Sequence, residues 1–194
     1  GMNILLTDYH RLLCDDALQW IGDDDKPFMM WLSFPEPHNP YQVSEPYYSM
    51  FPPEKLPPVR TGLKDLAVKG PEYELLHEMM SLGHAGYYEH LDRLRSNYLG
   101  MIRLIDDQIA RLVEQLRKDG TYENTVFVVT ADHETGGLVL VDGDERTGRV
   151  MGVYVSDDHT PAMLPVFAYG PGADKFCGTY MNTEIARRIK SLIK

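Results

Sequence analysis

The chain contains a run of strand-forming residues that ends abruptly in two polar side chains. In the stretch VFVVTADHETGG, residues 126–137, four apolar β-formers lead into Asp132 and His133, and a pair of glycines follows. A hydrophobic core cannot accept an unpaired carboxylate and imidazole. The strand must therefore end where these side chains reach solvent or a ligand. Two interpretations are open: a turn that is simply polar, or a metal ion bound at the end of a sheet.

Helix-like and strand-like segments alternate along the 194 residues. Apolar residues recur at spacings of three and four over residues 87–118, with Gly120 where a helix stop is expected. Shorter helices are expected over residues 11–21 and from an N-cap at Asn182 or Thr183 onward. Strands are expected at residues 27–34, 124–131, 137–141, 150–155 and 164–170. This alternation predicts an α/β fold, a sheet flanked by helices, in a single domain over residues 1–194.

A proline-dense segment follows the first expected strand. The run PFMMWLSF, residues 27–34, is continuously apolar, as expected for a strand buried on both faces. Residues 35–59 then hold eight of the thirteen prolines. Because proline removes a backbone donor and fixes φ, this density excludes a regular helix or a central strand. The sequence predicts a long surface excursion over about residues 35–60, of a length that is often functional.

Composition restricts the partners of the chain. With 29 acidic against 19 basic residues, the net charge is −10, and no basic stripe exists to neutralise phosphates, so a nucleic-acid partner is not expected. No apolar run reaches the length of a membrane span, and no charged-then-apolar leader opens the chain, so any secretory leader is expected to have been removed or never present. Cys14 and Cys177 are too few and too far apart in sequence for a disulfide scaffold or a thiolate zinc site.

Polar clusters follow three of the expected strands. Their members are Glu36 and His38, then Asp132 and His133, then Asp157, Asp158 and His159. In an open α/β sheet, ligands bind beyond the carboxyl ends of the strands. Carboxylate oxygen and imidazole nitrogen suit zinc and related divalent ions. The clusters are therefore candidate metal-binding positions, against the alternative that each is an ordinary loop residue satisfied by water or a backbone carbonyl.

The carboxyl-terminal part of the sequence resembles a known family. The motifs TADHETGG, DDHT and PVFAYGPGADKFCG, within about residues 126–194, resemble the carboxyl-terminal portion of an alkaline phosphatase. In that family the Asp and His of the TADH motif hold one catalytic zinc, and the His of the HT motif holds a second. The resemblance implies that Asp132 and His133 bind one metal and that His159 binds the other.

The preceding part, up to about residue 133, resembles a bacterial type I sulfatase. The resemblance rests on PFMMWLSFPEPHNPY, on the helix YLGMIRLIDDQIARLVEQLRKDG and on YENTVFVVTADH. It implies that His38 contacts the sulfate ester and that Asp132 helps to hold a single cation, often calcium. Both families belong to one superfamily with an α/β sheet. The two resemblances agree on the fold and on Asp132, but they differ on the ester and on the metal, zinc if phosphatase-like and calcium if sulfatase-like.

The amino-terminal region matches these families only in part. The stretch MNILLTDYH resembles the first strand of sulfatases, which would make Asp8 a metal ligand; alternatively it corresponds to a Thr-Asp pair just before a helix. Both families need an early nucleophile, in the sulfatase pattern C/S-x-P-x-R or as a Ser after an Asp. Neither pattern is found, and the surroundings of Cys14 and Cys177 do not match it. The domain is therefore expected to be truncated.

These observations predict a metal-dependent hydrolase-type domain for sulfate or phosphate monoesters. Its partner would be a small anionic ester. Without a recognisable nucleophile, activity of the chain alone is expected to be impaired. The alternative is a non-catalytic pseudoenzyme that keeps the sheet and binds a metal or a partner protein, and a phosphomutase-type activity is a weaker possibility.

Overall fold

A computed structural model describes residues 5–22, 26–59, 70–83, 86, 88–156 and 158–193. The chain divides into two compact units, each of which is described by itself. The first comprises Gly1–Lys26 with Met30–Gln115, and the second Pro27–Met29 with Leu116–Lys194. No helix in the described ranges is both long enough and apolar enough to cross a membrane.

The first unit is organised by the long helix α5, Leu91–Lys118. Asp92 lies in its first turn and Arg117 and Lys118 in its last, which complements the helix dipole, and Gly120 follows with a φ of 73°. The predicted helix over 87–118 is thus confirmed, preceded by a 3₁₀ turn at Tyr88–His90. The buried face of α5 carries Ser96, Asn97, Met101, Leu104 and Gln108.

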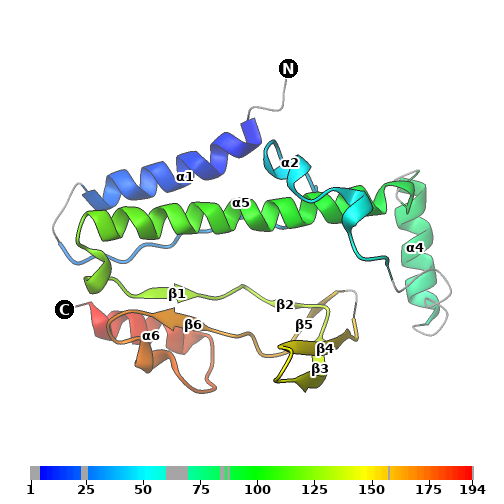
Figure 1. Cartoon of the computed structure of the whole chain (residues 1–194). Coiled ribbons are helices and arrows are strands. Elements are labelled where there is room, and N and C mark those ends of the chain that lie inside the picture. Colours follow the sequence, from blue (N-terminus) through cyan, green and yellow to red (C-terminus); the bar gives the residue numbers. More distant parts are fainter. Residues whose placement is uncertain are drawn as a thin grey trace. The chain divides into compact units, whose positions relative to one another are not determined.

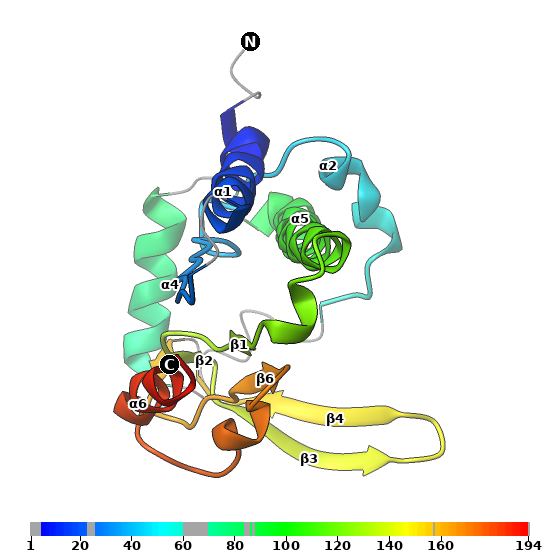
Figure 2. The ribbon, with the colours of Figure 1, turned by 90° about the vertical axis from the view of Figure 1, so that its left-hand side faces the viewer.

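Helix α1, Leu5–Gly22, lies beside α5 (Figures 1 and 2). It confirms the helix expected over 11–21 and begins six residues earlier, so residues 5–10 of the stretch that resembles a first sulfatase strand are helical in this chain. Cys14 and Ala17 are buried, and Arg111 of α5 pairs with the carboxylate of Asp15. Burial raises the pKa of the Cys14 thiol. Cys14 and Cys177 are both free thiols.

The proline-dense segment packs against α5 within the first unit. It contains the short helix α2, Tyr47–Met50, and a 3₁₀ turn at Pro53–Lys55. Side chains of α5 satisfy its backbone carbonyls: Ser96 donates to Phe51 O at 2.5 Å, and Asn97 donates to Tyr41 O at 2.9 Å. A proline-rich backbone lacks N–H donors for its own carbonyl oxygens, and these side-chain donors take their place. The excursion is therefore an ordered covering of α5 whose Tyr47 is buried.

Gly100 marks the closest approach between α5 and this segment. A Cβ at Gly100 would lie 2.7 Å from Tyr47 O and 3.0 Å from Val43 Cγ1. Alanine normally stabilises a helix interior by about 0.5–1 kcal/mol relative to glycine. Here we expect Gly100→Ala to lower the free energy of unfolding by about 1–3 kcal/mol, because the clash falls on backbone. Urea unfolding measures the change.

Gly143→Ala provides the matched control for this prediction. Its Cβ would lie 3.6 Å from Arg149 O, an ordinary contact, so we expect little change in stability. A Gly100→Ala protein as stable as the wild type would show that the backbone of the proline-dense segment does not press against α5.

One predicted strand is absent from the structure. Residues 27–34 have no regular secondary structure, and Trp31 is 82% exposed, so the prediction of a strand buried on both faces is wrong. A strand needs a neighbour with which to exchange backbone hydrogen bonds, and none of the described strands pairs with this segment. The first unit also contains the helix α4, Pro71–Gly83.

The second unit contains the strands. The four strands expected after residue 120 are confirmed as β1 Phe127–Val129, β3 Leu138–Asp144, β4 Arg149–Tyr154 and β6 Phe167–Tyr169. Two short strands were not expected, β2 Glu134–Thr135 and β5 His159–Thr160. Among the described residues they form three two-stranded antiparallel sheets, β1–β6, β2–β5 and β3–β4 (Figure 1).

Helix α6, Thr183–Leu192, closes the chain and follows Asn182 as expected. It packs on a 3₁₀ turn at Ala173–Phe176, whose Phe176 is buried. Figure 2 shows β3 and β4 side by side as a long hairpin. Helices and short strands together form a partial α/β fold.

Candidate metal site

The β2–β5 ladder places the two polar strand ends of the second unit beside each other (Figure 1). Its register pairs Glu134 with Thr160 and Thr135 with His159. The loop after β1 therefore meets the loop after β4. As a result the imidazole rings of His133 and His159 stack, with centroids 3.5 Å apart and an interplanar angle of 25°. Residues separated by 26 positions in sequence thus come into direct ring contact.

Each of these histidines follows an aspartate in the same local geometry. Asp132 Oδ1 accepts the His133 backbone N–H at 3.0 Å, and Asp158 Oδ1 accepts the His159 backbone N–H at 2.7 Å. This Asx-type contact fixes the backbone at both histidines. The remaining carboxylate oxygen of Asp132 lies 3.5 Å from His133 Nε2.

Both ring nitrogens of His133 have a polar neighbour. His133 Nδ1 lies 3.3 Å from the backbone oxygen of Glu134. A carbonyl oxygen only accepts, so this contact requires a proton on Nδ1, whereas the Thr135 hydroxyl, whose oxygen lies 3.4 Å from Nδ1, can donate to an unprotonated Nδ1. In the tautomer with Nδ1–H, Nε2 is an acceptor that faces the carboxylate of Asp132, so the two atoms can serve as a pair of donors to one cation.

The spacing of these two atoms fits a shared cation. Bonds of 2.0–2.2 Å at a tetrahedral angle separate neighbouring ligand atoms by about 3.3–3.5 Å, and Asp132 Oδ2 and His133 Nε2 lie 3.5 Å apart. Asp132 is 87% exposed and His133 38% exposed, so both are accessible. Among the described side chains, no three His, Cys, Asp or Glu groups converge as a complete cation cage. The structure therefore assembles a pair of donors with a second imidazole stacked on it.

The glycine pair of the motif allows the two loops to approach. Gly136 and Gly137 have φ values of 91° and 60° and are buried. A Cβ would lie 2.6 Å from the Tyr154 ring at Gly136 and 2.7 Å from Val155 Cγ2 at Gly137. Gly136 also accepts from the backbone N–H groups of Val155 and Ser156 and donates to Asp158 O. Only glycine combines this backbone conformation with this closeness.

Glu134 is a further residue of this candidate site, and no strand-end or family motif had pointed to it. Its carboxylate accepts hydrogen bonds from the Thr160 hydroxyl and from the backbone N–H groups of Gly137 and Leu138. The Thr160 hydrogen bond foremost, with the backbone donors and the nearby His133, lowers the pKa of Glu134. A carboxylate two residues before a glycine pair, where turn N–H groups need an acceptor, is the signal that could have identified it.

The other predicted residues lie elsewhere or outside the described region. His38 lies on an exposed turn of the first unit, with Nδ1 2.7 Å from Asn39 O, so its Nε2 is the nitrogen left for a ligand. Glu36 lies two residues earlier and is half-buried. Asp8 belongs to α1, with its side chain outside the description, and Asp157 lies outside the described residues. The proposed roles of His38 and Asp8 remain predictions.

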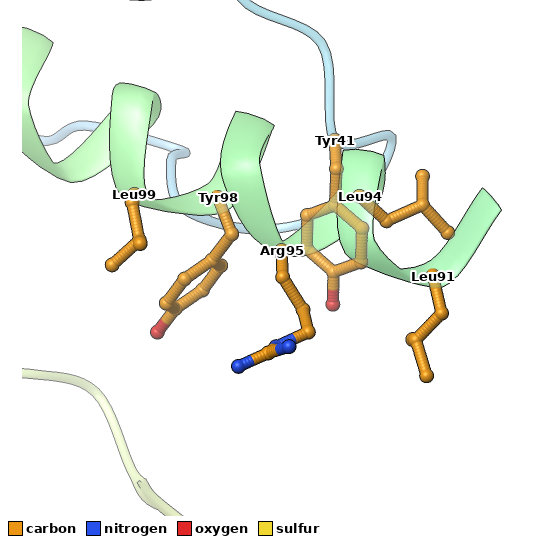
Figure 3. A pocket seen from close by; sticks show the side chains of 6 residues that line it. All are labelled: Tyr41, Leu91, Leu94, Arg95, Tyr98 and Leu99. Atoms are coloured by element: carbon orange, nitrogen blue, oxygen red, sulfur yellow. The ribbon is translucent and has the colours of Figure 1, made fainter. Parts of the chain in front are cut away.

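The first unit also carries a pocket of about 310 Å³ at the amino-terminal half of α5 (Figure 3). It is lined by Tyr41, Leu91, Leu94, Arg95, Tyr98 and Leu99. The Arg95 guanidinium donates hydrogen bonds to Asp92 Oδ1 at 2.8 Å and to Pro57 O at 2.7 Å. The tyrosine rings of Tyr41 and Tyr98 meet edge to face at 5.9 Å, leaving no slot between them. The pocket thus presents leucine and tyrosine surface rather than a polar reaction site.

Comparison with known proteins identifies a solved structure with a similar fold and the family of this chain. The structure of a phosphonate monoester hydrolase of Agrobacterium radiobacter matches with a TM-score of 0.61 at 24% identity, covering 84% of this chain and 33% of that chain. At this identity the match shows the fold. The family model named Sulfatase matches residues 5–149, more than half of the chain. The chain belongs to the sulfatase family.

Curated relatives come from both branches that the motifs resemble. An arylsulfatase of Clostridium perfringens is 31% identical over 150 residues, covering 77% of this chain and 29% of the relative. The multifunctional alkaline phosphatase superfamily protein PehA of Trinickia caryophylli is 28% identical over 126 residues, which cover 58% of this chain and 24% of the relative. The predicted family is confirmed, and the chain spans less than a third of the length of these relatives.

Proposed function

We propose that this domain provides the metal-binding part of a hydrolase for sulfate or phosphate monoesters. The observation that carries the proposal is the 3.5 Å spacing of Asp132 Oδ2 and His133 Nε2, with the His159 ring stacked beside them. Membership of the sulfatase family supports this chemistry. Asp132 and His133 would hold one divalent cation, His159 would bind the same or a second ion, and Asp8 would be a further ligand.

The residues of the chain have separable roles in this proposal. A bound cation would stabilise negative charge on the ester oxygens. Asp132 would supply an anionic oxygen, and His133 would bind through Nε2 in the tautomer whose Nδ1–H donates to Glu134 O. His38 would contact the ester through Nε2; to donate from there while Nδ1–H is bonded to Asn39 O, its ring must be cationic. Zinc would accompany phosphatase-like chemistry and calcium sulfatase-like chemistry.

Metal content tests this proposal directly. We expect near-stoichiometric zinc or calcium in the purified protein by elemental analysis, and loss of that metal in the double variant Asp132→Ala/His133→Ala. Equal folding of the two proteins, checked by circular dichroism, is the control. A wild-type protein that takes up neither ion at millimolar concentration would overturn the proposal.

A second candidate function is a non-catalytic module that retains the metal site for stability or for binding a partner. Turnover of para-nitrophenyl sulfate or phosphate separates the two functions. We expect the chain alone to show little or none, and a chelator-sensitive rate would exclude the non-catalytic alternative.

A further inference from the structure

A single carboxylate ties together the two loops that carry the stacked histidines. Glu134 follows His133 directly, and Thr160 follows His159 directly. The Thr160 hydroxyl donates to Glu134 Oε2 across the β2–β5 ladder. The ladder is only two residues long on each strand, and the backbone hydrogen bonds of Gly136 also join the loops, so this bond is the side-chain link next to both histidines.

All described hydrogen-bond partners of the Glu134 side chain are donors, so both of its carboxylate oxygens must act as acceptors. Besides Thr160, Oε2 accepts from Gly137 N–H at 2.9 Å, and Oε1 accepts from Leu138 N–H at 3.2 Å. The Thr160 oxygen itself accepts from Ala162 N–H at 3.3 Å, so its one proton is available for Glu134. A glutamine would place an NH₂ group against one of these donors, and an aspartate would be one methylene too short.

The backbone of Glu134 adds a direct link to the histidine. Its carbonyl oxygen accepts from His133 Nδ1 in the tautomer that leaves Nε2 as the free ring nitrogen. The side chain thus anchors the peptide that orients His133, and through Thr160 it anchors the peptide next to His159. Partners of this kind around a metal ligand commonly change metal affinity by about 10–100-fold.

We propose that Glu134 is a positioning residue of the metal site, which holds His133 against His159 through Thr160 and the Gly137–Leu138 turn. The inference rests on the proposed function in naming the bound ligand as a divalent cation. The hydrogen bonds and the ring contact that it explains exist independently of the cation.

Two measurements on Glu134→Gln test the proposal. In metal-free protein, nuclear Overhauser contacts between the ring protons of His133 and His159 report the stacking. Zinc and calcium titrations by calorimetry report affinity. We expect Glu134→Gln to lose the ring contact and to bind the cation about 10–100-fold more weakly. The control is Glu145→Gln, the same charge change on the exposed turn of the β3–β4 hairpin, which should leave both readouts unchanged.

Variants of Thr160 provide a second test in case the Glu134 variant folds poorly. Thr160→Val removes the donated proton and should reproduce the Glu134→Gln effects, whereas Thr160→Ser restores the hydroxyl and should restore both readouts. Retention of the ring contact and of wild-type affinity in Glu134→Gln and Thr160→Val would overturn the proposal. If the wild type binds neither cation, the proposed function fails, while loss of the ring contact in metal-free Glu134→Gln would still establish the positioning role.

Discussion

Asp132→Asn should weaken binding of the divalent cation by more than about 100-fold. The substitution keeps the size of the side chain but removes the negative charge and one acceptor oxygen of the donor pair with His133. Loss of a group that merely orients a ligand already costs about 10–100-fold, and loss of the ligand itself should cost more. Calorimetric titration of metal-free protein with zinc, and separately with calcium, measures the change.

Asp158→Asn is a control provided by the chain itself. Asp158 accepts the backbone N–H of His159 just as Asp132 accepts that of His133, and the other Asp158 oxygen has no described contact with an imidazole. An effect that arises only from the Asx-type backbone contact should therefore appear equally in both variants. We expect Asp158→Asn to bind the cation within about threefold of the wild type, a minor change by comparison. Equal losses in the two variants would show that Asp132 supports the loop and is not a ligand.

Sequence periodicity predicted those elements whose apolar residues repeat regularly within a single segment. Helix α5 repeats its apolar residues every three or four positions and is followed by Gly120, so its carboxyl-terminal end could be predicted. The same reasoning was wrong for residues 27–34, because a short apolar run shows only that a segment favours burial. Whether it becomes a strand depends on a neighbouring strand that lies elsewhere in the chain. The sequence likewise predicted a sheet flanked by helices but not which strands pair, and the described strands form three antiparallel pairs. Strand pairing depends on two segments at once, so it cannot be predicted from either one alone.

In the candidate site too, the residues could be predicted from sequence, but the contacts between distant segments could not. Asp132, His133 and His159 could be selected because each follows a strand-like run and matches a family motif, and the structure brings His133 and His159 together. The means of bringing them together could not be predicted. Strands β2 and β5 have two residues each, too short for any periodic signal, and the Glu134–Thr160 bond joins residues 26 positions apart.

In the first unit, the largest effect on stability is expected for Met101→Ala. Met101 is 1% exposed and lies on the buried face of α5. Alanine forms helices at least as well as methionine, so a decrease in the free energy of unfolding would come from lost packing and not from a weaker helix. Removing a buried methionine side chain leaves a cavity, and comparable substitutions cost about 2–5 kcal/mol. We expect a loss of this size in the free energy of unfolding from urea titrations followed by far-ultraviolet circular dichroism.

Met79→Ala is the matched control for this prediction, since Met79 lies on helix α4 and is 61% exposed. The same atoms are removed, but from a side chain that already contacts water, so the change should stay within about 0.5 kcal/mol. A large difference between the two variants would locate the stabilising core on the Met101 face of α5. If Met101→Ala were as mild as Met79→Ala, the covering of α5 by α1 and the proline-dense segment would have to be loose enough to collapse around the missing side chain.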